Sequence, residues 1–182
     1  MGYTLPEGRR IFTRKAQFQY GWDWGPSLNT IGIWKGVSLN AWNDAKIEHV
    51  YLKKKSYTKD QAKITAKITL SDPPKEPTLI VLSIAGKDFS LPIQAGNEKK
   101  EFDVPLTIDN PKFWWPHNLG EPYLYEVDIK LRKGAVVTDN LKVNHGVRNV
   151  SLIYDDDQYG QSFYFMINGI PVYMKGANYI PQ

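Results

Sequence analysis

A short segment near the amino terminus places two indole rings and a carboxylate within three residues, Trp22, Asp23 and Trp24. Sugar rings have apolar C–H faces and a rim of hydroxyl groups, so they bind well against an aromatic wall with a carboxylate that accepts hydrogen bonds. On a strand, Trp22 and Trp24 would share one face. The flanking glycines and Pro26 indicate that this strand ends in a shaped loop. The segment is a candidate sugar-binding site; alternatively, both tryptophans are core residues and Asp23 stabilises a turn.

The other residues that could act as acids, bases or metal ligands form no complete active site. His49, His117 and His145 are far apart and lack ligand spacing, so each is expected to be an ordinary strand or turn residue. The acidic run 155–157 could suggest calcium, but it lacks the ligand spacing of an EF-hand loop, and a solvated turn is expected. No phosphate-binding loop or serine nucleophile motif occurs. The sequence therefore predicts no catalytic residue, no metal site and no cofactor.

A second aromatic cluster, Pro111-Lys112-Phe113-Trp114-Trp115-Pro116, is predicted to serve packing. Its two prolines fix the backbone. The large rings are therefore expected to close one end of a folded unit or to pack on a neighbouring unit, with ligand binding as the alternative.

Composition limits the function classes. The absence of cysteine excludes disulfides, catalytic thiols and thiolate metal sites. The net charge is +4, but the lysines are spread along alternating positions rather than clustered with arginines, which favours a solvated surface over nucleic-acid binding. No stretch approaches the roughly 20 apolar residues of a membrane span. The first ten residues lack the apolar run of a secretory signal peptide.

The elements that must position these residues have a period of two between residues 46 and 145. Apolar and polar side chains alternate in three long runs, 63–70, 102–108 and 123–131. Shorter runs fit further strands at 47–52, 78–84, 89–93 and 140–143. Turn residues fill the gaps, as in Ser71-Asp72-Pro73-Pro74. About seven short strands without helical periodicity predict an all-β fold, an immunoglobulin-like β-sandwich.

The segments on either side are expected to be incomplete by themselves. Residues 1–45 are dense in Trp and Gly and are predicted to form two or three strands that cannot close a core alone. After residue 145, a new set of strands is predicted at 147–153, 163–167 and 171–174. We expect the open edges and faces of residues 1–45 and 162–182 to cause self-association, disorder or strand exchange between chains.

Three groups of motifs resemble family 2 glycoside hydrolases, in the domain order of that family. The first resembles the end of the sugar-binding domain of β-mannosidases: Arg14-Lys15-Ala16-Gln17-Phe18, Gly21-Trp22-Asp23-Trp24-Gly25-Pro26 and Gly32-Ile33-Trp34-Lys35-Gly36-Val37. The second resembles the family's immunoglobulin-like domain: the cluster at 111–116 with Pro122-Tyr123-Leu124-Tyr125. The third resembles the start of its (β/α)8 barrel: Gly146-Val147-Arg148, Asn168-Gly169-Ile170-Pro171-Val172 and Lys175-Gly176-Ala177-Asn178. Tyr179 departs from the pattern, because many β-mannosidases have tryptophan there.

The resemblance implies three parts. Residues 1–45 would be a remnant of a jelly-roll-like sugar-binding β domain, residues 46–145 the sandwich, and residues 146–182 the first strands of the catalytic barrel. The parent would be a retaining β-mannosidase that removes terminal non-reducing β-D-mannose from oligosaccharides or glycoconjugates. Its two catalytic glutamates would lie later in the barrel, so this chain alone is expected to be an inactive fragment.

The resemblance also implies roles for single residues. Asp23 would lie on a loop that reaches the sugar pocket and would accept hydrogen bonds from mannose hydroxyls, between Trp22 and Trp24. Asn178 would lie at the end of a barrel strand, where barrel active sites are formed, and would line the pocket or else shape the turn. Arg148 would pair with a carboxylate at a domain junction. Three alternatives stay open: another family 2 activity, such as β-galactosidase or β-glucuronidase; a free-standing carbohydrate-binding or adhesion module; and a structural or protein-binding module, since immunoglobulin-like sandwiches serve many purposes.

Overall fold

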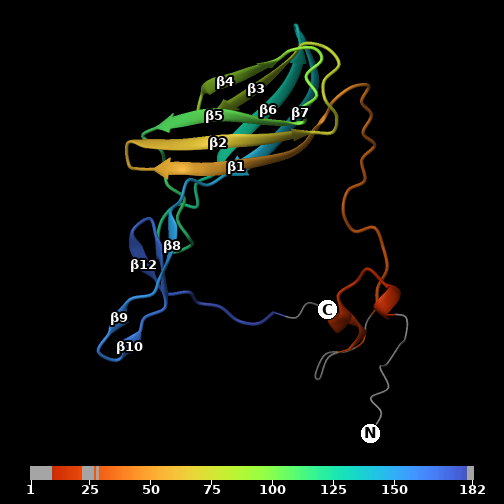
Figure 1. Cartoon of the computed structure of the whole chain (residues 1–182). Coiled ribbons are helices and arrows are strands. Elements are labelled where there is room, and N and C mark those ends of the chain that lie inside the picture. Colours follow the sequence, from red (N-terminus) through yellow and green to blue (C-terminus); the bar gives the residue numbers. More distant parts are fainter. Residues whose placement is uncertain (1–9, 22–26, 28, 180–182) are drawn as a thin grey trace. The chain divides into compact units, whose positions relative to one another are not determined.

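The computed structural model describes residues 10–21, 27 and 29–179 (Figure 1). The chain divides into two compact units, one formed by residues 1–40 with 174–182 and the other by residues 41–173. All strands of the described residues belong to the larger unit.

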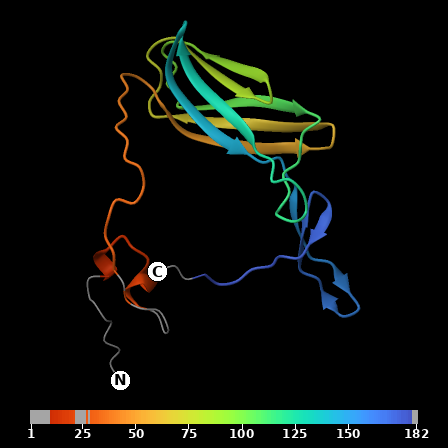
Figure 2. The ribbon, with the colours of Figure 1, turned by 180° about the vertical axis from the view of Figure 1, so that it is seen from behind.

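Seven antiparallel strands of this unit form a two-layer sandwich (Figures 1 and 2). The first sheet has the order β1-β2-β5, with bounds Ile47–Tyr57, Gln61–Leu70 and Glu101–Asp109. The second has the order β4-β3-β6-β7, with bounds Lys87–Ile93, Thr78–Ile84, Tyr125–Lys133 and Val136–His145. Within the described residues, β1 and β7 each pair with one neighbour only, so both are edge strands. The predicted all-β sandwich of seven strands is confirmed.

The core between the two sheets follows from the alternation of side chains along each strand. In β2, every second residue is 0–2% exposed: Ala62, Ile64, Ala66, Ile68 and Leu70. In the facing sheet, Ile80 and Leu82 of β3 and Ile129 and Leu131 of β6 are fully buried. Successive side chains of a strand point to opposite faces, so a period of two buries one face and leaves the other in water. Burial of one such aliphatic side chain stabilises the fold by roughly 1.5–3 kcal/mol.

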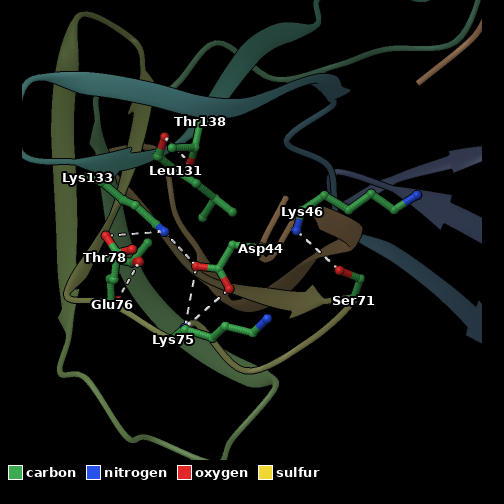
Figure 3. A network of polar contacts seen from close by, with 9 residues as sticks. All are labelled: Asp44, Lys46, Ser71, Lys75, Glu76, Thr78, Leu131, Lys133 and Thr138. Carbon is green, nitrogen blue, oxygen red and sulfur yellow. Dashed lines mark hydrogen bonds and ion pairs between the residues drawn. The ribbon is translucent and has the colours of Figure 1, made fainter. Parts of the chain in front are cut away.

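A polar network around Asp44 fixes the segment that leads into β1 (Figure 3). The Lys75 backbone N–H donates to the two Asp44 carboxylate oxygens over 3.2 and 3.4 Å. The Lys133 ammonium lies 2.7 Å from Asp44 Oδ2 and 3.5 Å from Glu76 Oε2. The Asp44 side chain is only 13% exposed. The network therefore joins the segment before β1, the β2–β3 loop and the end of β6.

The stabilisation from Asp44 should depend on pH. Burial alone would raise the pKa of Asp44, but hydrogen bonds from Lys133 and from the Lys75 N–H outweigh burial and hold the pKa below 3.8. A depressed folded-state pKa gives stability that is present above the unfolded pKa of about 3.9 and is lost as pH falls through the lower folded value. We expect Asp44→Asn to lower the free energy of unfolding by about 1–2 kcal/mol at neutral pH.

Urea unfolding at a series of pH values measures this effect. The difference between wild type and Asp44→Asn should shrink as the pH falls below about 4. Asp72→Asn is the matched control, because the Asp72 side chain is 58% exposed and lies 3.7 Å from Lys100; it should change stability by less than about 1 kcal/mol. A difference for Asp44→Asn that stays constant at every pH would contradict the assignment.

A smaller antiparallel sheet follows the sandwich in sequence. It has the order β12-β11-β8, with bounds Ile170–Val172, Tyr164–Ile167 and Val150–Ile153. β8 and β11 are shorter than the predicted runs 147–153 and 163–167 and lie within them, whereas β12 overlaps the predicted run 171–174 and begins one residue before it. Both pairings in this sheet are antiparallel.

The acidic run lies in a two-stranded ribbon, β9 (Asp156–Asp157) paired with β10 (Gly160–Gln161). Both aspartates of β9 are exposed. Throughout the described residues, no three His, Cys, Asp or Glu side chains are grouped so that they could hold a metal ion. A search of the same residues finds no helix with the length and apolar character of a membrane span.

The prediction of strands in residues 1–45 was wrong for the described part of that segment. It contains two short 3-10 helices, η1 (Arg10–Phe12) and η2 (Gln17–Tyr20), and none of its described residues belongs to a strand. Apolar side chains are left exposed, with Ile31 96% and Leu39 98% accessible. A strand needs a hydrogen-bonded neighbour to be stable, and no neighbour pairs with the described residues here.

Candidate functional site

The predicted sugar-binding residues divide between the described and the undescribed parts of the chain. Trp22, Asp23 and Trp24 lie outside the described residues. Asn178 is described: it is exposed and lies outside every strand and helix, beyond the end of β12 at Val172. The sugar-binding roles of all four residues therefore stay predictions.

The larger unit contains a groove of about 510 Å³ between the two edge strands, β1 and β7. Apolar side chains line one part of it: Val50, Leu52 and Val143. Polar and charged side chains line the part that adjoins β8: Lys54, Tyr57, His145 and Arg148. The groove is therefore apolar along part of its length and cationic at one end.

A β-bulge in β1 brings Tyr57 into this groove. Val50, Leu52 and Lys54 alternate toward one face of the strand, which would place Ser56 next. The register of β1 with β2 shifts between Lys54 and Ser56, so Tyr57 occupies the inner face instead and is 9% exposed. A bulge inserts one extra residue and redirects the side chains that follow it. Sequence periodicity alone did not identify Tyr57 as part of a site.

Tyr57 and His145 form a buried polar pair. The Tyr57 hydroxyl lies 2.8 Å from His145 Nε2. Burial raises the pKa of Tyr57 to about 12, although the nearby Arg148 charge opposes this shift. Burial, and then the charge of Arg148, lower the pKa of His145. Both groups are thus neutral near pH 7, and the tautomer of His145 sets which of the two donates. A tyrosine with this pKa is a poor base or nucleophile at neutral pH.

The junction between the sandwich and the small sheet is held by Asn168, in the turn between β11 and β12. Its Nδ2 donates to the Trp114 carbonyl over 3.0 Å, and its Oδ1 accepts from the Asn149 N–H over 2.8 Å. Asn168 and Gly169 have φ angles of +51° and +83°, which fits a tight turn of type I′. Asparagine is the side chain that tolerates this backbone and also supplies both a donor and an acceptor.

Trp114 occupies the same junction. The Trp114 backbone N–H donates to the Val147 carbonyl over 2.9 Å, and the Arg148 guanidinium lies 4.9 Å from the centre of the Trp114 ring. Gly146 runs against the ring, since a Cβ there would lie 3.2 Å from Trp114 Cβ. The aromatic cluster at 111–116 thus packs at one end of the sandwich, as predicted.

Asn168→Ala is expected to loosen the small sheet. The substitution removes two hydrogen bonds and places a less tolerant residue at positive φ, so we expect a loss of about 2–3 kcal/mol in the free energy of unfolding. Hydrogen exchange of the β11 and β12 amides should accelerate more than exchange in β2. Asn118→Ala is the matched control for backbone strain, because Asn118 is exposed and has a φ of +70°. Equal losses in the two variants would show that the side-chain hydrogen bonds contribute nothing.

Acidic residues of the sandwich have structural contacts. Asp109 lies 2.5 Å from the Lys87 ammonium and accepts a hydrogen bond from Gln61. Glu126 lies 2.8 Å from the Lys142 ammonium, on an exposed face. Asp139 accepts a hydrogen bond from the Ile47 N–H over 2.6 Å, which links β7 to the start of β1. These contacts connect strands of the sandwich to one another. None of these three carboxylates lines the groove.

Two family models match the chain. Residues 45–148 match glycosyl hydrolases family 2, and residues 2–35 match the glycosyl hydrolase 2 galactose-binding domain-like family. Among curated relatives, β-mannosidase B of Aspergillus flavus is 33% identical and that of Aspergillus oryzae 34% identical, each over 176 residues and 94% of this chain. The chain spans 21% of the length of these relatives.

Solved structures share the fold. The exo-chitosanase CsxA of Amycolatopsis orientalis matches 77% of this chain with a TM-score of 0.64 and 24% identity, over 17% of its own length. A glycosyl hydrolase family 2 member from Bacteroides cellulosilyticus matches 71% of this chain with a TM-score of 0.56 and 19% identity, again over 17% of its own length. The family match at 45–148 includes more than half of the sequence and all seven strands of the sandwich, and the chain therefore belongs to glycosyl hydrolases family 2.

Proposed function

We propose that this chain is part of a longer retaining β-mannosidase, which removes terminal non-reducing β-D-mannose from oligosaccharides or glycoconjugates. The observation that carries the proposal is the similarity to fungal proteins named β-mannosidase B, which extends over 94% of the chain rather than over the sandwich alone. Because the chain spans about a fifth of those relatives, the chemistry is assigned to the rest of the longer protein.

We assign a separate role to each of three parts of the chain. Residues 1–45 complete a sugar-binding β domain, residues 46–145 form a spacer sandwich, and residues 146–182 lead into the catalytic barrel. The family matches at 2–35 and 45–148 support the first boundary. The second is supported by the end of β7 at His145 and the start of a separate sheet at Val150.

In this proposal two glutamates outside these 182 residues perform the reaction. One attacks the anomeric carbon; the other protonates the leaving oxygen and then activates water, with the two carboxyl groups about 5–5.5 Å apart. Asp44, Asp109 and Glu126 each form an ion pair with a lysine. These ion pairs support the view that carboxylates of the sandwich hold strands together rather than react with a substrate.

The sugar contacts proposed for this chain come from the aromatic segment near its amino terminus. Asp23 accepts hydrogen bonds from mannose hydroxyls, and Trp22 and Trp24 pack on the apolar faces of the sugar. Asn178 contributes an amide to the wall of the same pocket. A mannoside should bind the isolated chain only weakly, because these residues form at most one wall of the pocket.

Substrate selectivity tests the proposal. The longer protein should hydrolyse an aryl β-mannoside with a kcat/KM at least about tenfold above its values for the matching β-galactoside and β-glucuronide. Preference for either of the other glycosides would assign the chain to a different family 2 activity. Submillimolar binding of mannose by the isolated chain in calorimetry would instead favour a carbohydrate-binding module.

A further inference from the structure

The groove between β1 and β7 is built to receive a ligand with both apolar and charged groups. Val50 and Leu52 point into it from β1, and Val143 from β7. Each of these three side chains is only half-buried, although each faces inward. Contact with apolar groups of a ligand would remove more of this apolar surface from water, which is favourable.

The cationic end of the groove lacks an acidic counterpart. The lining includes Lys54 and Arg148 but neither aspartate nor glutamate. Among the residues that the structure describes, no ion pair involves either cation. The Lys54 ammonium donates to Asn149 Oδ1 and lies 5.4 Å from the centre of the Tyr57 ring. The two cations are thus held by neutral groups, and a carboxylate between them would complete the arrangement.

Both walls of the groove are sheet edges. In the described part of the chain, β1 pairs only with β2, and β7 pairs only with β6. At the outer edge of β1, the Ile47 N–H donates to Asp139 and the Tyr57 carbonyl accepts from Asn149. Between these two residues, and along β7, no strand of the described residues pairs with the outer edge, so an extended polypeptide can pair there as an added strand. A sugar would satisfy few of the backbone N–H and C=O groups at these edges. Another copy of this chain fits less well, because its net charge is +4.

We infer that this groove binds an extended acidic polypeptide segment. Alternate apolar side chains of the segment contact Val50, Leu52 and Val143, its backbone pairs with an edge strand, and its carboxylate lies between Lys54 and Arg148. The inference goes beyond the proposed function, because it concerns a polypeptide ligand and does not use the sugar-binding segment.

The test uses this chain labelled with ¹⁵N and two blocked pentapeptides. One has the sequence Val-Thr-Val-Glu-Asp, and its neutral partner has Val-Thr-Val-Gln-Asn. The acidic peptide should produce saturable amide shifts in β1 and β7 with a dissociation constant below about 1 mM, and binding should weaken when salt is raised. The neutral peptide should bind at least about fivefold more weakly, since it cannot form the charge-assisted hydrogen bonds.

Matched variants locate the site. Lys54→Met and Arg148→Met keep the aliphatic stem and should each weaken the acidic peptide about fivefold. Lys53→Met is the control, because Lys53 is the neighbour of Lys54 on the opposite face of β1 and should have no effect. Amide spectra of the unliganded variants verify their folding.

Each of the following results would overturn the inference: equal binding of the two peptides, no saturation by about 5 mM peptide, the same loss in Lys53→Met, or groove shifts with glucuronate but not with peptide. Groove shifts that appear when the chain alone is concentrated would identify a second copy as the occupant and would equally reject an acidic segment.

Discussion

Asp23→Ala in the longer protein is expected to lower kcat/KM for an aryl β-mannoside by about 10²–10⁴-fold. In the proposed pocket, Asp23 accepts two charge-assisted hydrogen bonds from sugar hydroxyls. Loss of such bonds costs about 1.5–3 kcal/mol each, and every 1.36 kcal/mol corresponds to a factor of ten in rate. Steady-state kinetics with the aryl glycoside measure the change.

Two comparisons separate a binding role of Asp23 from a structural one. Asp23→Asn keeps the size and one acceptor oxygen, so its loss of kcat/KM should be smaller than that of Asp23→Ala. The melting temperature of the longer protein should be nearly unchanged in both variants. Full activity of Asp23→Ala would reject the sugar contact, and a large fall in melting temperature would favour the alternative in which Asp23 stabilises a turn.

Leu82→Ala is expected to cause the largest loss of stability within the sandwich. Leu82 is fully buried in β3, which pairs with β4 on one side and β6 on the other. Truncation of a buried leucine removes its transfer free energy and leaves a cavity, at a typical cost of about 2–5 kcal/mol. Because β3 is a central strand, the site can collapse little, and we expect a value in the upper half of this range. Urea unfolding of this chain measures it.

The control for Leu82→Ala is Val136→Ala, which also shortens an aliphatic side chain on a strand. Val136 is 64% exposed at the start of β7. Its truncation should change the free energy of unfolding by no more than about 0.5 kcal/mol. A loss below about 1 kcal/mol for Leu82→Ala would mean that the two sheets do not pack as described.

The sandwich was predictable because most of its strands have one buried face and one solvent-exposed face. The alternation in 63–70, 102–108 and 123–131 corresponds to β2, β5 and β6, whose buried residues recur at every second position. β7 was predicted only in part, because its first residues are exposed and show no alternation of buried and exposed side chains. For β7 the prediction covered 140–143, whereas the strand begins at Val136, in a stretch that is exposed throughout its first three residues.

The groove could not be predicted in the same way. Lys53, Lys54 and Lys55 are three charged residues in a row, so the sequence shows no alternation that would predict the continuation of β1 to Tyr57. The bulge that turns Tyr57 inward depends on pairing with β2. The partner of Tyr57, His145, is distant in sequence and was expected to be an ordinary residue. Such a contact is set by tertiary structure, and no local spacing encodes it. A possible signal was a lone histidine ending a strand immediately before Gly146 and Arg148.

In the amino-terminal segment, the sequence predicted strands that the described residues do not form. Its Trp- and Gly-rich composition resembles strands of a β domain, and the prediction followed that composition. In the described residues, the side chains of Ile31, Ile33 and Trp34 are more than 80% exposed and no ladder forms. A strand is a property of a pair of segments, so composition predicts one only where the partner is present.

We propose that this chain is part of a β-mannosidase whose catalytic carboxylates lie elsewhere in the protein. The most direct measurement is hydrolysis of an aryl β-mannoside by this chain and by the longer protein, at equal concentrations. We expect an active longer protein and no turnover by residues 1–182 above the rate of the uncatalysed reaction. Turnover by this chain alone would place the reacting groups within these residues and would refute the proposal.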